Sequence, residues 1–142
     1  MRIRWALGWM SIVACLALAS CSRAPQAVIR NASGADLLLW PLAARPVALR
    51  SGETTEPILY ATHERQQALI ERGNCLYTYP APDYFNLPKH LRGYAPRVTV
   101  VIREDMSLSI HERSREGVEG AEIVAGGFPL RPTTYCGRRT DG

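Results

Sequence analysis

Residues 98–102 read Val-Thr-Val-Val-Ile, so every side chain in this short run branches at Cβ. Branched side chains are stiff and pack well on a pleated, half-buried surface, which predicts a β-strand. Glu104, Asp105 and Met106 interrupt the run, and residues 108–110 then alternate apolar and polar. The pattern predicts a hairpin with one buried face.

Comparable short runs recur along most of the chain and are separated by turn-forming residues. They are residues 27–30, 37–40, 47–50, 58–60 and 75–79, with residues 128–136 as a last, proline-interrupted edge strand. About seven short strands with little helix predict a mainly β fold, a small antiparallel β-sandwich of immunoglobulin-like type. A partly open barrel is the alternative.

Three segments depart from this rhythm. Residues 62–72 have a capping Thr62 at one end and Gly73 just beyond the other, which predicts one short helix. An extended connection is the alternative there. Residues 113–127 are charged and rich in glycine, so we expect a loop. We expect the tail, residues 137–142, to be disordered.

The first 20 residues are organised like a secretory signal peptide. Arg2 and Arg4 form a charged n-region, and an apolar run follows from Trp5 to Ala19. This run of about fifteen residues is shorter than the roughly twenty that a membrane-spanning helix needs. We therefore expect residues 1–20 to be removed during export.

Leu18, Ala19, Ser20 and Cys21 end this segment. They resemble the lipobox of bacterial lipoprotein precursors, which has an aliphatic residue, two small residues and a cysteine. The resemblance implies that Cys21 receives a thioether-linked diacylglycerol and becomes the new N-terminus. Attached lipid would then hold the protein on a membrane without a transmembrane helix. An ordinary signal peptide with an incidental cysteine is the alternative.

Ser22 follows the lipidated position. In the lipoprotein pattern an Asp there favours retention in the inner membrane. Ser22 therefore implies the outer membrane of the bacterial cell envelope, with the protein facing the periplasm. Residues 21–26 form the lipidated N-terminus and a very short tether, and residues 27–136 form a single β-rich domain. We expect this domain to sit close to the lipid surface.

The remaining cysteines follow from this assignment. Of four cysteines, Cys15 lies in the signal segment and Cys21 carries lipid, which leaves Cys75 and Cys136. Two cysteines in a chain bound for an oxidising compartment predict a disulfide. It would close a loop of about 60 residues, worth roughly 4 kcal/mol in the chain-entropy model. A metal or redox pair is the alternative, although no Cys-x-x-Cys spacing is present.

The charge distribution argues against nucleic-acid binding. Without Arg2 and Arg4, the seventeen basic residues become fifteen against thirteen acidic residues, a net charge of +2. A nucleic-acid-binding domain would need a concentrated basic face, whereas these charges are interspersed. We expect no nucleic-acid partner.

Catalytic signals in the sequence are weak. His63 and His111 each precede a glutamate, and in principle the two histidines and an acidic residue could bind a metal. However, no His-Glu-x-x-His motif is present. Adjacent residues on a strand point to opposite faces, so a His-Glu dipeptide chelates poorly. Ser33 and Ser51 lack the Gly-x-Ser-x-Gly surroundings of a hydrolase nucleophile. We expect no catalytic residue, metal or cofactor, and interpret these histidines and His90 as exposed polar residues.

The segment from Tyr77 to Tyr94 is rich in aromatic residues and prolines. Aromatic and arginine side chains are enriched at interface hot spots, and proline lowers the entropy lost when a loop becomes ordered. The segment is therefore a candidate binding surface with four contact residues: Tyr84, Phe85, Arg92 and Tyr94. The alternative is that the rings fold a long loop onto the sheet. Tyr77 and Tyr79 should share one strand face with Cys75.

Together these features predict a lipid-anchored envelope lipoprotein that binds another envelope protein or a glycan rather than catalysing a reaction. Two other classes stay open. One is an inhibitor of a secreted enzyme such as a lysozyme; those enzymes are basic, so a net positive charge counts against it. The other is a small hydrolase or metal-binding protein, which the scattered histidines alone favour.

Overall fold

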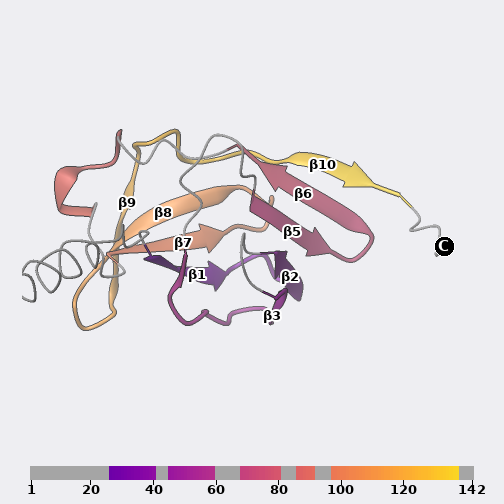
Figure 1. The fold of residues 1–142 in the computed structure, drawn as a ribbon, viewed down its shortest axis with the longest axis horizontal. Coiled ribbons are helices and arrows are strands. Elements are labelled where there is room, and N and C mark those ends of the chain that lie inside the picture. Colours follow the sequence, from indigo (N-terminus) through magenta and orange to yellow (C-terminus); the bar gives the residue numbers. More distant parts are fainter. Residues whose placement is uncertain (1–25, 41–44, 60–67, 81–85, 92–96, 138–142) are drawn as a thin grey trace, which may run out of the picture.

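The computed structural model of the chain describes residues 26–40, 45–59, 68–80, 86–91 and 97–137. Within these ranges the chain forms ten β-strands in two five-stranded sheets and contains no α-helix (Figure 1). The strands are β1 (Gln26–Asn31), β2 (Leu37–Trp40), β3 (Val47–Leu49), β4 (Ile58–Leu59), β5 (Ala68–Arg72), β6 (Cys75–Tyr79), β7 (Val98–Ile102), β8 (Leu108–Arg113), β9 (Glu119–Ile123) and β10 (Thr133–Cys136). The predicted mainly β fold and small β-sandwich are confirmed.

The first sheet has the strand order β4-β1-β7-β8-β9. The predicted hairpin lies within it, since β7 and β8 pair antiparallel with Val100 opposite Ile110. In the turn between them, the Ser107 hydroxyl and N–H both donate to the Asp105 carboxylate, at 2.6 and 2.9 Å. These bonds, the hydroxyl bond foremost, stabilise the ionised carboxylate and lower the pKa of Asp105.

One pairing in the first sheet departs from the predicted antiparallel arrangement. β1 and β7 run parallel, with Val28 opposite Thr99 and Asn31 opposite Ile102. Parallel neighbours require a long connection between them. Here the chain leaves β1 after Asn31 and forms β2, β3, β5 and β6 of the second sheet before it returns as β7.

The second sheet has the strand order β10-β6-β5-β2-β3 and is antiparallel throughout. β5 corrects the helix predicted for residues 62–72, because residues 68–72 are a strand; the earlier part lies outside the described ranges. Ile70 of β5 lies opposite both Leu39 of β2 and Tyr77 of β6. Burial of Ile70 between two partner strands outweighs the local helical signals.

β9 corrects the loop predicted for residues 113–127, because it forms the outer strand of the first sheet. It pairs antiparallel with β8, and two ion pairs add to this ladder: Arg30 of β1 to Glu119 at 2.8 Å, and Arg103 to Glu122 at 2.6 Å. Both pairs join residues that are distant in sequence, and local sequence patterns do not report such contacts.

The predicted last strand is confirmed only near its end. β10 is an edge strand of the second sheet and pairs with β6. Before it, Leu130 forms an isolated bridge with Leu108 of the first sheet. Residues 128–136 therefore cross from one sheet to the other.

The two sheets pack against each other around one apolar core. The core side chains are Ala27, Val98, Val100, Ile102, Leu108 and Ile110 from the first sheet, Leu37, Leu39, Leu49, Ile70 and Tyr79 from the second, and Leu87, Leu91, Met106, Phe128 and Leu130 from the connections. Removal of these side chains from water is the main force that holds the sheets together.

Asn31 links the two sheets at the end of β1. Its side chain is buried, and its amide nitrogen donates to the carbonyl oxygens of Ala35 at 2.7 Å and Leu49 at 3.0 Å. Its amide oxygen accepts from the N–H and the hydroxyl of Ser33, at 3.0 and 2.7 Å. Because a buried amide costs free energy unless it is hydrogen-bonded, this complete pairing makes its burial tolerable.

Candidate functional site

Most of the predicted site residues lie outside the described residues. They are the lipidation site Cys21 and the four contact residues Tyr84, Phe85, Arg92 and Tyr94. These assignments stay predictions. The structure does describe the predicted disulfide, the two tyrosines that begin the aromatic segment, and two of the three histidines.

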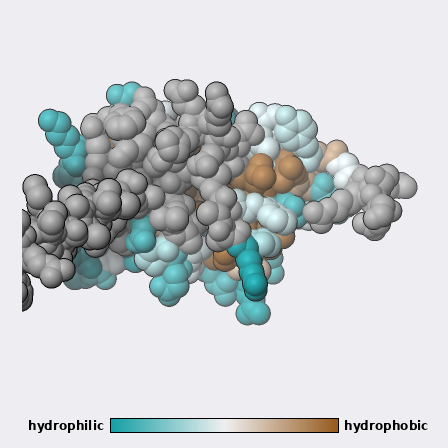
Figure 2. All heavy atoms as spheres, in the orientation of Figure 1, coloured by the Kyte–Doolittle hydropathy of each residue, from teal (hydrophilic) through white to brown (hydrophobic). Residues whose placement is uncertain are grey.

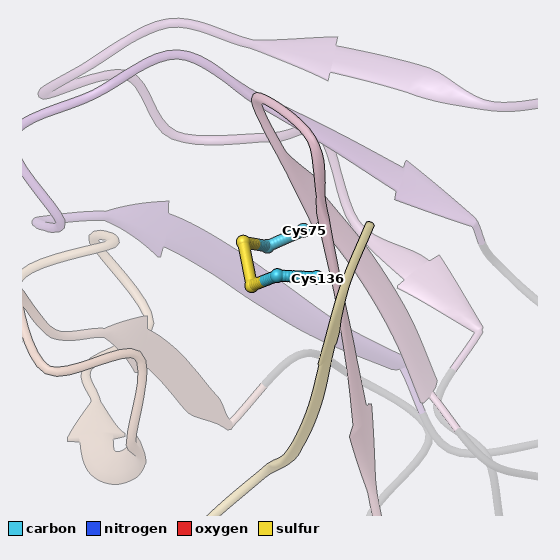
Figure 3. Close-up of a disulfide and its surroundings, with 2 residues drawn as sticks. All are labelled: Cys75 and Cys136. Carbon is cyan, nitrogen blue, oxygen red and sulfur yellow. A yellow bond between two sulfur atoms is a disulfide. The ribbon is translucent and has the colours of Figure 1, made fainter. Parts of the chain in front are cut away.

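Cys75 and Cys136 form the predicted disulfide (Figure 3). Cys75 begins β6 and Cys136 ends β10, and the two lie directly opposite each other with Cα atoms 4.1 Å apart. One residue further out, the Gly137 N–H donates to the Asn74 carbonyl at 3.4 Å. The disulfide therefore joins neighbouring strands of one sheet and holds the edge strand β10 covalently.

Tyr77 and Tyr79 contribute to the core rather than to a binding surface. Tyr79 is 1 % exposed, and its hydroxyl donates to the Met106 carbonyl at 2.7 Å. Burial raises the pKa of the Tyr79 phenol above its usual value. Tyr77, two residues earlier on β6, is partly buried against the same core. For these two rings, the structure favours packing onto the sheet.

Three polar side chains meet on the face of the first sheet that points away from the core. We call them the Ser109–His111–Glu119 chain. The Ser109 hydroxyl lies 3.3 Å from His111 Nε2, while His111 Nδ1 lies 3.3 Å from the Gly120 carbonyl oxygen and 3.5 Å from the Glu119 carboxylate. Because a carbonyl oxygen can only accept, Nδ1 donates to it, and in the neutral ring Nε2 is then the acceptor for the serine hydroxyl.

This order of groups is that of a serine hydrolase triad, but two features favour a structural role. Ser109 is 0 % exposed, so a substrate cannot reach its hydroxyl. Glu119 accepts two bonds of 2.8 Å from the Arg30 guanidinium, which ties β9 to β1. Local sequence patterns do not reveal this group, because they predict a loop at Glu119, whereas Glu119 begins β9. The Ser-x-His spacing of residues 109–111, which puts both side chains on one strand face, is the signal that would have found its first two members.

His111 and Glu112 point to opposite sides of β8, as expected for adjacent residues on a strand. His111 contacts Gly120 and Glu119, whereas the Glu112 carboxylate lies 3.2 Å from Nε2 of the exposed His90. Among the described residues, no three His, Cys, Asp or Glu side chains form a group that could hold a metal ion. The third histidine, at position 63, lies outside those residues.

No protein family, curated protein or solved structure matches this chain. In the part of the chain that the structure describes, no helix is long and apolar enough to cross a membrane. Function is therefore inferred from the residues of this chain alone.

Proposed function

We propose that this protein is a bacterial envelope lipoprotein, anchored by lipid on Cys21, that binds another envelope protein or a glycan without catalysing a reaction. The pairing of the cysteines carries the proposal. Cys75 and Cys136 are bonded to each other, as expected for a chain that works in an oxidising compartment. The lipobox-like residues 18–21 give Cys21 a separate role, and Ser22 favours the outer membrane.

Binding is favoured over catalysis by the state of the Ser109–His111–Glu119 chain. Its serine is buried and its carboxylate is held by Arg30, so these groups stabilise the first sheet. A binding role needs an exposed surface instead. The sequence supplies candidates for it in Tyr84, Phe85, Arg92 and Tyr94, where aromatic and arginine side chains occur together.

Replacement of Cys21 by serine tests the anchor. Serine cannot form the thioether to diacylglycerol, so we expect Cys21→Ser to accumulate as an uncleaved or soluble precursor. The Ser22→Ala variant keeps the cysteine and should be processed and anchored like the wild type. Cell fractionation and the mass of the isolated protein distinguish these forms. If Cys21→Ser still fractionated as a mature, detergent-extracted membrane protein, the anchoring proposal would be wrong.

A second experiment tests the proposed contact residues. Envelope components are cross-linked to the mature lipoprotein and recovered with it, for the wild type and for the double variant Tyr84→Ala, Phe85→Ala. Loss of two hot-spot rings should lower partner recovery by about tenfold or more. Val124→Ala is the control, because Val124 is an exposed residue just after β9 and lies outside the aromatic segment. Equal recovery from the double variant would remove this segment from the binding surface.

A further inference from the structure

The outer face of the second sheet carries a group of five apolar side chains. Side chains alternate along a strand, so the residues next to the core positions of β2, β5 and β6 point outwards. The outward-pointing apolar side chains are Leu38, Trp40, Leu69 and Leu76, joined by Tyr135 on β10. We call this set the apolar face.

The strand register gathers these side chains into two adjacent rows. The first row runs across four strands through Leu38, Glu71, Leu76 and Tyr135. The second row runs through Trp40, Leu69, Thr78 and Thr133. Glu71 is the only charged residue in the two rows, so the apolar face is almost uninterrupted by charge.

This face is accessible. Trp40 is 37 % exposed and Tyr135 is 61 % exposed, and the three leucines are partly exposed. Figure 2 shows apolar surface, in brown, beside polar surface, in teal, where β2, β5 and β6 lie in Figure 1. The outer face of an antiparallel sandwich is ordinarily polar, because water covers it. Five exposed or partly exposed apolar side chains grouped on one outer face make this face a candidate contact site.

The area of the apolar face is too small for a stable contact with a second copy. Two rows across four strands, at about 4.8 Å between strands and about 6.8 Å between side chains on one face, cover roughly 260 Å². Two copies would then bury about 520 Å² in total, whereas stable protein interfaces bury about 1,200 Å² or more. The apolar face should therefore contact a surface beside which the protein is already held, because such a contact does not need the area of a stable protein interface.

We propose that the apolar face contacts the lipid surface on which the protein is anchored. This inference rests on the lipidation of Cys21 proposed above. Cys21 is five residues from Gln26, the first residue of β1, so even a fully extended tether reaches only about 18 Å. The domain is thereby kept at high effective concentration beside the membrane, where a modest apolar contact is enough to fix its orientation.

The chemistry of the apolar face fits a bilayer surface. Tryptophan and tyrosine are enriched where a membrane meets water, since their rings are apolar and carry one polar group. Here Trp40 and Tyr135 lie on different strands of the sheet, with Leu69 and Leu76 on the strands between them. The leucines would enter the apolar boundary, and the two rings would lie at the level of the headgroups.

Tryptophan fluorescence can report this contact. The three tryptophans are Trp5, Trp9 and Trp40, and the first two lie in the signal segment. Trp40 is therefore the only tryptophan of the mature chain. The mature lipoprotein is inserted into phosphatidylcholine vesicles with either ordinary or brominated acyl chains. Bromine quenches tryptophan at short range, so we expect brominated lipid to reduce Trp40 emission by about half or more if the ring lies at the interface.

Two variants give the matched comparison. In Trp40→Phe with Val124→Trp, the reporter moves to an exposed position after β9 on the first sheet and should escape quenching. In Leu76→Ser with Tyr135→Ser, Trp40 is kept but the apolar face is weakened, so quenching should fall. Flotation of the vesicles measures anchoring separately from this contact.

The outcomes separate the contact from the anchor. Protein that fails to float refutes the lipidation of Cys21. Protein that floats while brominated lipid leaves Trp40 emission unchanged refutes the membrane contact and leaves the anchor intact. A third outcome is that brominated lipid does not quench Trp40 emission but solubilised envelope proteins shift it. This outcome also refutes the membrane contact, and it assigns the apolar face to a protein partner.

Discussion

Tyr79 carries a polar atom into the apolar core and pairs it there. The ring fills space between the sheets, and the hydroxyl donates to the Met106 carbonyl at 2.7 Å. This bond connects β6 of the second sheet to the β7–β8 turn of the first. Phenylalanine would keep the ring and leave the buried carbonyl without this donor, which isolates the contribution of one hydroxyl.

We expect Tyr79→Phe to lower the free energy of unfolding by about 1–2 kcal/mol at neutral pH. Urea unfolding of the soluble chain beginning at Ser22 measures this change. Tyr135→Phe is the matched control, because its hydroxyl is on an exposed side chain and its removal should change stability by less than about 0.5 kcal/mol. Equal stability of Tyr79→Phe and the wild type would show that the bond to Met106 contributes nothing.

The same substitution has a predicted pH signature. The pKa of Tyr79 is raised by burial in the folded chain, whereas the unfolded chain releases this proton near pH 10. The stabilising contribution is therefore complete below about pH 10 and is lost as the pH rises above it, because only the unfolded state deprotonates there. The wild type should lose stability above pH 10 more steeply than Tyr79→Phe does. Parallel pH profiles for the two proteins would contradict the burial of this phenol.

At the scale of single elements, the sequence predicts well where neighbours in sequence are also neighbours in space. The β7–β8 hairpin is of this kind, since its two strands are separated only by a short turn. β5 and β9 are exceptions, because each pairs with a sequence neighbour, β6 and β8 respectively, and yet their local residues predict a helix and a loop. Both also make contacts with distant parts of the chain: β5 pairs with β2, and the β9 glutamates bond Arg30 and Arg103. Local sequence patterns do not report these contacts, and tertiary context overrides the local preference in both elements.

The candidate sites divide in the same way. A disulfide can be predicted from the number of cysteines and their compartment, and Cys75–Cys136 is confirmed. The Ser109–His111–Glu119 chain and the apolar face depend on which strand lies beside which. Leu38 and Leu76 are 38 residues apart in number, and only the order β6-β5-β2 places them in one row. Single-sequence patterns contain no direct signal for this order.

At the scale of the whole molecule, the disulfide closes a loop that contains most of one sheet. Cys75 and Cys136 are 61 residues apart, and β7, β8 and β9 lie between them. In the unfolded chain the bond would restrict this whole segment, although in the folded chain it links only two adjacent strands. Its main effect should therefore be on the entropy of the unfolded state.

We expect the double variant Cys75→Ser, Cys136→Ser to lose up to about 4 kcal/mol of unfolding free energy relative to the oxidised wild type. Urea unfolding, followed by circular dichroism, measures the loss. Thr134→Ser changes an exposed position on the same edge strand without touching the bond and should stay within about 0.5 kcal/mol of the wild type. A double variant as stable as Thr134→Ser would show that the crosslink does not constrain the unfolded chain.

Local chemistry is enough to predict a β-rich domain, the hairpin at residues 98–110 and the cysteine pair, because β-branched runs, turn residues and cysteine numbers act through near neighbours or through the compartment. Lipidation of Cys21 stays a prediction of the same local kind. The parallel pairing of β1 with β7, the strand fate of residues 68–72 and the apolar face arise from contacts between distant segments. Their free energy depends on which strands meet, and that depends on the packing of the whole chain around one core.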